Sequence, residues 1–351
     1  TKPSNQEQFI PLVLDATIKG AENSKIGSPL YAIHLSNINF KDFYVERYAA
    51  GSASWIQDLT VSNSYGDFPF TRTGNGIIST HPTGPYFYLD EMAGYRIIID
   101  DGAGNKKIRM IRSNSEGALN NQTTKKCIIH LDDAESSDAT SGIATVIPDS
   151  ITLIWEQTAD AAAIGIRITA QETREDYFEM GMVLIGRVFI PGKQYSRGRQ
   201  IQFAAGVEQA TQQDGTTRQR ITGKGKRSVS IAWTDGIDVS QLNEEAANPD
   251  YIRAVSNTTN PAAAVNDVPE SMMGMAKLLD GSNLPLVCLP RIFKQTNSGS
   301  VVYWNFNRRD DQILVRLQSN VSIENVTGDE LGSGLTGEVF RVGTADFEEV
   351  I

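Results

Sequence analysis

Short strand-like runs separated by turn-forming residues dominate the chain, and this pattern constrains its fold more than any other feature. The runs alternate between apolar and polar residues or are rich in β-branched and aromatic side chains, which is typical of strands. Many short strands with regular turns favour a β-sandwich or a β-barrel. The strongest runs are Tyr31–Ile38, Tyr95–Ile99, Lys107–Ile111, Cys127–Leu131, Ile151–Trp155, Ile164–Thr169, Tyr177–Ile190, Arg199–Glu208, Ser228–Trp233, Val301–Phe306 and Ile313–Leu317.

Two hairpins are predicted from these runs. The first covers residues 95–112 and reverses direction at the glycine-rich segment Asp101–Asn105. The second covers residues 199–233 and reverses direction at Gln213–Thr216. A hairpin as long as the second one extends beyond the sheet in which it starts.

Helix signals are confined to two short segments, residues 238–248 and 268–280. Ser240 is suited to cap the first segment, which ends before Pro249. Asp267 is suited to cap the second, and its methionines at helical spacing are interpreted as core residues. The predicted fold class is therefore all-β with two short helices.

The length of 351 residues allows two domains, and the charge pattern suggests where they meet. A long apolar strand ends just before Pro191. Residues 193–227 then carry eight basic side chains against two acids, whereas residues 235–270 carry seven acids against one arginine. We expect a domain over residues 1–191 and a second over residues 192–351, with charge of opposite sign on two parts of the second.

Composition disfavours several classes of protein. The net charge of −10 makes the chain a poor nonspecific ligand for nucleic acid or an anionic membrane. No apolar run reaches the ~18 residues of a membrane-spanning helix. Cys127 and Cys288 lie in different predicted domains, so we expect two thiols rather than a disulfide. The first residues lack a secretory apolar region, and we expect synthesis in a reducing cytosol.

Three acidic clusters are candidates for metal binding or catalysis. The loop after His130 offers oxygen ligands suited to calcium but lacks the EF-hand pattern, so a solvated loop is favoured. The acids of residues 172–179 could contain a glycosidase pair, but a solvated turn is favoured. The third cluster, Asp100 and Asp101, is fully explained by a hairpin turn. The acids are Asp100, Asp101, Asp132, Asp133, Glu135, Asp138, Glu172, Glu175, Asp176 and Glu179.

Other catalytic and cofactor motifs are missing from the sequence. None of the three histidines lies in a recognisable catalytic motif, and His34 is interpreted as a packed strand residue. The segment Gly223–Arg227 lacks the spacing of a phosphate-binding loop. We therefore predict no catalytic residue, no metal and no cofactor, and a protein that is not an enzyme.

Aromatic residues concentrate in the first predicted domain. Most of them are expected in the core, but exposed aromatic rings also form subunit contacts or stack on sugars. The candidates for a glycan or partner contact are Trp55, Tyr86 and Tyr88.

One stretch is similar to a pattern found in virion proteins of tailed bacteriophages. In those proteins a jelly-roll domain of the galactose-binding type closes with a characteristic strand pair. Residues Arg167–Ile168 and Tyr177–Gly186 match this pair, and Ile151–Trp155 precedes it. The following basic segment, residues 195–233, resembles the continuation in tail-tip and baseplate proteins. The resemblance covers about 40% of the chain, residues 150–290.

The resemblance implies a non-enzymatic structural protein of the virion, made in the host cytoplasm. Residues 1–191 would form the jelly roll, and residues 192–351 a tube-like or ring-forming β domain near the distal tail ring. Its partners would be further copies of itself in a ring, the tail tube, the hub and fibres, and a host-surface glycan. Many distal tail proteins have the two domains in the opposite order, so a decoration, adaptor or fibre-attachment protein stays open.

The basic part of the second hairpin is the candidate subunit interface. It would face the acidic segment 235–270 of a neighbour, because a ring joins two different patches. DNA in a tail channel is the competing ligand, but the acidic chain makes nucleic acid the less favoured one. The candidate residues are Arg218, Arg220, Lys224, Lys226 and Arg227.

Two further functions stay open. The chain could be a soluble carbohydrate-binding adhesion protein that uses its first domain as a lectin. It could also be a glycan-degrading enzyme with acids drawn from residues 132–138 or 172–179.

Overall fold

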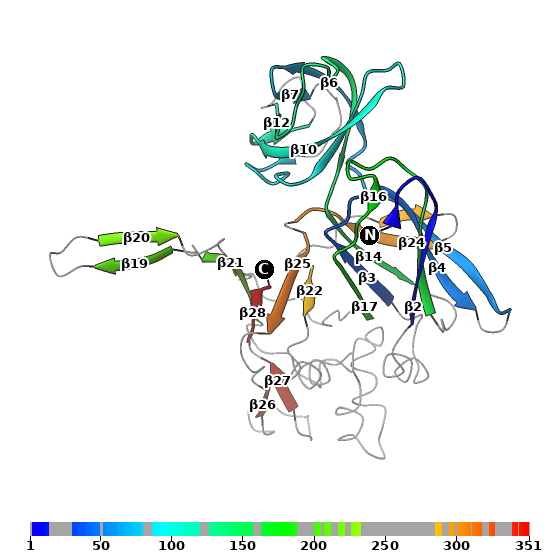
Figure 1. The fold of residues 1–351 in the computed structure, drawn as a ribbon. Coiled ribbons are helices and arrows are strands. Elements are labelled where there is room, and N and C mark those ends of the chain that lie inside the picture. The colour runs from blue at the N-terminus through cyan, green and yellow to red at the C-terminus, as the bar shows by residue number, and fades with distance from the viewer. Residues whose placement is uncertain are drawn as a thin grey trace. The chain divides into compact units, whose positions relative to one another are not determined.

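The structure, a computed structural model, contains only strands as regular elements in its described part, so the predicted all-β class is confirmed (Figure 1). The predicted helices at residues 238–248 and 268–280 lie outside the described residues. The described residues are 2–13, 30–49, 52–79, 86–119, 126–156, 163–187, 200–204, 207–211, 217–221, 226–232, 285–289, 295–298, 301–309, 311–317, 323–326, 339–342 and 344–350.

The chain divides into two compact units. The first contains residues 1–22, 28–186 and 290–312, and the second contains residues 23–27, 187–289 and 313–351. The chain thus leaves the first unit near residue 186 and returns to it at residue 290. The predicted boundary at Pro191 lies outside the described residues.

A sandwich of two antiparallel sheets forms one part of the first unit. The first sheet has the order β17 (Met182–Arg187), β3 (Leu30–Ser36), β14 (Ser150–Glu156), β24 (Val301–Phe306) and β23 (Gln295–Ser298). The second has the order β2 (Gln8–Val13), β15 (Ala163–Ile168), β4 (Asp42–Ala49) and β5 (Ser54–Ser62). A short ladder joins β1 (Lys2–Pro3) to β16 (Tyr177–Phe178). The predicted run 177–190 is therefore split into β16 and β17 within its described part.

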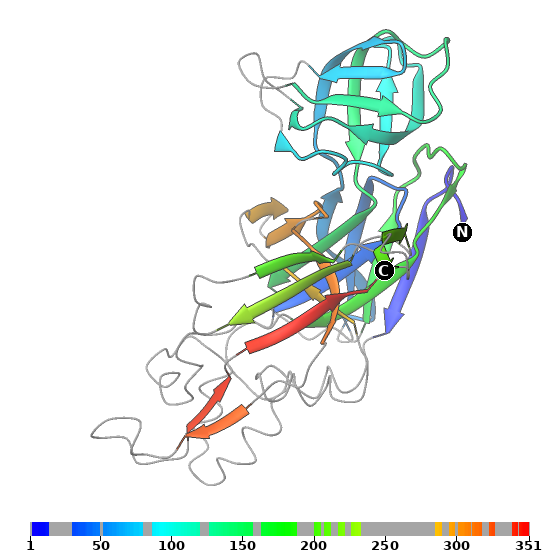
Figure 2. The same cartoon turned by 90° about the vertical axis from the view of Figure 1, so that its left-hand side faces the viewer.

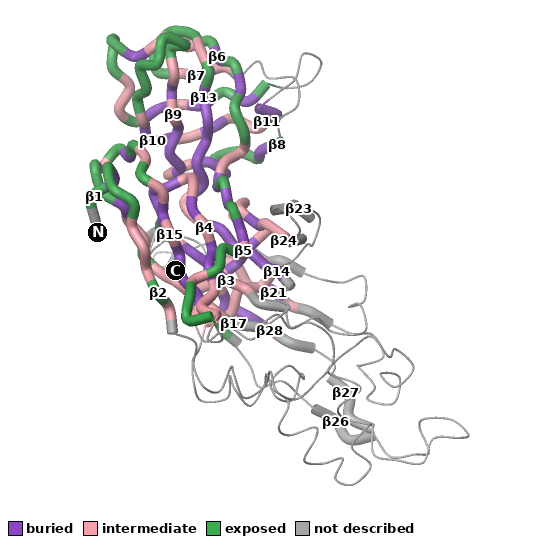
Figure 3. Tube along the Cα trace, turned by 90° about the vertical axis from the view of Figure 1, so that its right-hand side faces the viewer, coloured by how far each residue is buried: buried purple, intermediate pink, exposed green. Residues whose placement is uncertain are grey.

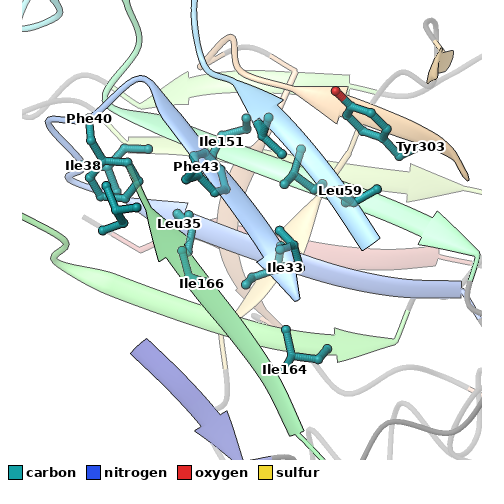
Figure 4. Close-up of a cluster of buried hydrophobic side chains, with 14 of the residues drawn as sticks. Ile33, Leu35, Ile38, Phe40, Phe43, Leu59, Ile151, Ile164, Ile166 and Tyr303 are labelled. Carbon is teal, nitrogen blue, oxygen red and sulfur yellow. The ribbon is translucent and has the colours of Figure 1, made fainter. Parts of the chain in front are cut away.

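The two sheets share one apolar core, because apolar residues recur at every second position of their strands. Ile33 and Leu35 of β3, Phe43 of β4, and Ile164 and Ile166 of β15 are buried in it (Figure 4). The return of the chain to the first unit completes this core, since β24 pairs with β14 and contributes a buried tyrosine.

A six-stranded closed barrel is inserted between β5 and β14 (Figure 2). Its strands are β6 (Asp67–Thr73), β7 (Gly76–Ser79), β9 (Arg96–Asp100), β10 (Lys106–Asn114), β12 (Ile128–Leu131) and β13 (Ser141–Ile147). Asn63 Nδ2 donates to the Pro148 carbonyl at 2.9 Å, so the entry and exit of the barrel lie side by side. A second buried cluster fills the barrel, and Figure 3 shows buried positions along β9 and β13.

The first predicted hairpin is confirmed as β9 and β10, with Asp100 opposite Lys106. The neighbouring strand β13 approaches its turn so closely that only glycine fits at residue 142. A Cβ on Gly142 would lie 2.0 Å from the Asp100 carbonyl oxygen.

The described strands of the second unit form one five-stranded sheet and two separate ladders. The sheet has the order β18 (Gln200–Ala204), β21 (Lys226–Ala232), β28 (Thr344–Glu349), β25 (Ile313–Leu317) and β22 (Leu286–Cys288). The ladders are β19 (Val207–Thr211) with β20 (Thr217–Ile221), and β26 (Ile323–Val326) with β27 (Val339–Val342). Because β18 pairs with β21 and β19 pairs with β20, the second predicted hairpin is confirmed.

Candidate functional site

The acidic loop after His130 is organised by Arg109 of β10. Two hydrogen bonds of 2.9 and 2.5 Å join the Arg109 guanidinium to the buried Asp138 carboxylate. Glu135 lies 3.2 Å from the same guanidinium, and Arg174 reaches Asp133 at 3.0 Å. Burial raises the pKa of Asp138, but its hydrogen bonds with Arg109 lower that pKa below the ordinary value overall. These acids are neutralised by arginine, and no metal-holding group of three ligands occurs among the described residues.

The acids of residues 172–179 meet a second buried arginine. Glu175 accepts hydrogen bonds from Arg96 at 3.0 Å and from Asn39 at 3.0 Å, and Glu179 lies 3.7 Å from the same guanidinium. Burial raises the pKa of Glu175, but the hydrogen bonds from Arg96 and Asn39 lower it overall. A carboxylate held in this way is poorly suited to act as a general acid.

The two acids of the first hairpin stabilise its turn by accepting backbone hydrogen bonds. Asp100 accepts the Gly102 amide at 2.8 Å, and Asp101 accepts the Ala103 and Asn105 amides. The turn interpretation of these two residues is confirmed.

The buried histidine and the cysteines also match their predicted structural roles. His34 is 6% exposed and contacts Thr152 on the neighbouring strand. Cys127 and Cys288 form no disulfide, as predicted, and burial raises the pKa of the Cys127 thiol to about 12.

Trp55 is packed into the surface of the sandwich. Its ring lies edge-on to Phe9 and Tyr48, with centroid distances of 4.8 and 5.4 Å. The Phe9 and Trp55 rings cover Gly165, where a Cβ would lie 2.6 Å from Phe9 and 3.0 Å from Trp55. Much of the Trp55 ring is thus used to cover a glycine of the sheet.

Tyr86 and Tyr88 lie on the barrel and are displayed to solvent. They are 41% and 55% exposed, and the adjacent Leu89 is 70% exposed. The two tyrosine rings meet edge-to-face with centroids 6.0 Å apart. We call Tyr86, Tyr88 and Leu89 the aromatic patch. The structure brings these residues together and places Trp55 in the sandwich instead.

The aromatic patch is held by a rigid frame. Phe87, between the two tyrosines, is buried in the barrel core, and β8 (Tyr86–Phe87) pairs with β11 (Gly117–Ala118). The Tyr86 hydroxyl donates to Glu116 at 2.7 Å. The Tyr88 amide donates to Glu91 at 2.9 Å, and the Tyr88 carbonyl accepts from Asn114 at 2.8 Å. Little conformational entropy is then left to lose when a partner binds.

Sequence reasoning missed Leu89 and Glu116 as members of this site. The alternation Tyr-Phe-Tyr is a usable signal for two outward rings around one buried ring. No sequence signal joins Glu116 to Tyr86, because that contact depends on the pairing of β8 with β11.

The basic residues of the second hairpin occupy different positions. Arg218 and Arg220 lie on β20, opposite Ala210 and Glu208 of β19. Arg227 on β21 forms hydrogen bonds of 2.9 and 2.5 Å to Glu349 of the adjacent strand β28. Lys226 begins β21, and Lys224 lies outside the described residues, as do Gly223 and Gly225. Of the predicted interface residues that the structure describes, the two arginines of β20 therefore lie on the β19–β20 ladder, whereas Lys226 and Arg227 lie in the five-stranded sheet.

No protein-family model matches the chain, and no curated protein or solved structure matches it either. Within the described part of the chain, no helix has the length and apolar character needed to cross a membrane. The candidate sites are thus defined by geometry and chemistry alone.

Proposed function

We propose that this protein is a non-enzymatic structural subunit of the virion of a tailed bacteriophage, located in a ring at the tail tip or baseplate. The observation that carries the proposal is the β19–β20 ladder. It pairs with no other strand among the described residues, although it continues the hairpin that starts in the five-stranded sheet.

An isolated two-stranded ladder is marginally stable in water. Its outer edges pair with no strand of the described part of the chain, and an unpaired strand edge favours pairing with another chain. A hairpin with such edges is well suited to engage a neighbouring subunit or another tail protein. The similarity of residues 195–233 to tail proteins supports the same function.

Charge supports contact with a second copy of the chain. Arg218 and Arg220 of β20 are paired in register with Ala210 and Glu208 of β19. Residues 207–227 carry five basic and two acidic side chains, whereas the whole chain has a net charge of −10. The basic hairpin therefore complements the acidic remainder of a neighbour.

The acidic clusters support a structural role. Arg109 holds the acids near residue 138, and Arg96 holds Glu175 and lies close to Glu179. Both clusters join segments that are distant in sequence, and this is the role expected of ion pairs that stabilise a fold.

Light scattering coupled to size exclusion tests the proposal. The wild-type chain should form a discrete higher oligomer, and Arg218→Glu combined with Arg220→Glu should yield folded monomers. Lys106→Glu with Lys107→Glu is the matched control, because it makes the same charge change at the tip of the β9–β10 hairpin, where both lysines are exposed. A wild-type monomer at every concentration, or an arginine variant that assembles normally at low and high salt, contradicts the proposal.

A second candidate function is carbohydrate binding at the aromatic patch. Its specific support is the rigid display of Tyr86 and Tyr88, since an exposed phenol offers both a ring face for a sugar and a hydroxyl for hydrogen bonding. Glycan-array binding should be lost in Tyr88→Ala and kept in Tyr177→Ala, which removes a tyrosine that is 38% exposed on β16. Equal binding by both variants, or no binding by the wild-type chain, contradicts this function.

A further inference from the structure

The carboxylate of Glu91 connects the aromatic patch to a distant part of the chain. One of its oxygens, Oε2, accepts the Tyr88 amide at 2.9 Å and the Arg308 Nη2 group at 2.7 Å. The other, Oε1, accepts Arg308 Nε at 2.8 Å. The pair is bidentate, and such pairs fix orientation as well as charge. The Glu91 side chain is buried, so a cationic partner such as Arg308 favours its charged form.

The turn at residues 88–91 sets how the aromatic patch is displayed. The Glu91 amide donates to the Tyr88 carbonyl at 3.3 Å, and Asp90 adopts a left-handed φ of 57°. Leu89 lies inside this turn. Asp tolerates a left-handed conformation better than most residues, and contacts around the turn add to its stability. The hydrogen bond from the Tyr88 amide to Glu91 is one of the contacts that do so.

Arg308 reaches this turn from the sandwich. It follows β24, which pairs with β14, and it lies 217 positions from Glu91 in the sequence. Its guanidinium also lies over the ring of Phe87, 4.9 Å from the centroid. Arg308 thus contacts both the carboxylate that holds Tyr88 and the buried ring between the two patch tyrosines.

We infer that Arg308 is a positioning residue for the aromatic patch, and that it couples the patch to the return of the chain through β24. When Arg308 is in place, Glu91 is held as the acceptor for the Tyr88 amide. Without Arg308, the Glu91 carboxylate loses a bidentate cationic partner, and the acceptor of the Tyr88 amide is held less firmly. By linkage, a partner that needs the patch in this geometry also stabilises the docking of Arg308.

Arg309 provides a matched control within the same segment. It pairs with Asp149 at 2.6 Å and lies over the ring of Tyr95, 4.7 Å from the centroid. Its removal therefore weakens a neighbouring ion pair of the first unit. Neither of these two contacts involves the turn at residues 88–91.

The experiment is amide hydrogen exchange on the full chain, without any ligand, for Arg308→Gln and Arg309→Gln. The Tyr88 amide should exchange about tenfold faster or more in Arg308→Gln, and within about twofold of wild type in Arg309→Gln. Chymotrypsin cleavage after Tyr88 or Leu89, located by mass spectrometry, should follow the same order. Equal effects of the two variants, or no effect of Arg308→Gln, overturn the inference.

A conservative variant distinguishes a local effect on the turn from destabilisation of the whole barrel. Arg308→Lys keeps the positive charge and loses the bidentate geometry, so it should give an intermediate exchange rate at Tyr88 while other barrel amides stay protected. If exchange rises throughout the barrel in Arg308→Lys, Arg308 supports the barrel as a whole and the positioning role is refuted. The inference uses the site of the second candidate function, but a failed glycan array leaves this result unaffected because no ligand is present.

Discussion

The substitution His34→Gln should remove a specific pH dependence of stability. His34 Nδ1 lies 2.8 Å from the Thr152 hydroxyl, and that hydroxyl donates to Gln312 Oε1 at 2.6 Å. A hydroxyl has only one proton to give, so His34 Nδ1 is the donor to Thr152. Nδ1 of the buried imidazole therefore carries a proton.

The size of the effect follows from the pKa of His34. Burial lowers this pKa from 6.5 to about 4, although the hydrogen bond with Gln312 acts in the opposite direction. Between pH 6.5 and pH 4 the imidazole of residue 34 is protonated in the unfolded chain but stays neutral in the folded chain. The neutral His34 therefore leaves the free energy of unfolding undiminished above pH 6.5. As the pH falls from 6.5 toward 4, this free energy decreases by about 3 kcal/mol in total because of His34.

Urea unfolding followed by tryptophan fluorescence measures this difference, because Trp155 lies in the sandwich core on β14, the strand that pairs with β3. The stability of wild type minus that of His34→Gln should fall between pH 7 and pH 4, with carboxylate effects cancelling in the subtraction. His130→Gln, which removes a half-buried barrel histidine, is the control. Two results would refute the reasoning. One is that the free energy of unfolding depends on pH in the same way in wild type and His34→Gln, and the other is that this pH dependence is lost in His130→Gln instead.

Three further predictions concern the barrel and the thiols. Gly142→Ala should destabilise the barrel strongly, because its Cβ would lie 2.0 Å from a carbonyl oxygen, whereas Gly102→Ala, with φ of 79° and open space, should cost only about 1 kcal/mol in thermal unfolding. Arg109→Gln should cost about 3–5 kcal/mol in urea unfolding because it leaves a buried carboxylate unpaired, and a loss below 1 kcal/mol contradicts this role. Iodoacetamide should modify Cys288 before the buried Cys127 in the folded chain, and mass spectrometry of the modified peptides shows the order.

The strand runs were predictable from the sequence because period-two alternation marks them locally. The strand pattern favoured a sandwich or a barrel, but the position and closure of the barrel were not predicted, because they depend on pairings that local patterns do not contain. β6 pairs with β13, more than 60 positions later, and the barrel closes only when β13 also pairs with β9. The hydrogen bond between Asn63 and Pro148 that joins its two ends is equally remote in sequence.

The candidate site was only partly predictable for the same reason. The sequence does not distinguish between the three aromatic candidates Trp55, Tyr86 and Tyr88. Only the fold shows that the ring of Trp55 covers Gly165 whereas the rings of the two tyrosines face solvent. The acidic clusters are visible in the sequence, but Arg96 lies far from Glu175 along the chain. The fold shows which charge neutralises which.

Electron microscopy of the purified protein tests the central claim most directly. The account predicts closed rings in which the density of each β19–β20 hairpin lies between neighbouring subunits. Isolated single particles at high protein concentration, or rings whose subunit contacts leave the hairpins unengaged, would contradict it.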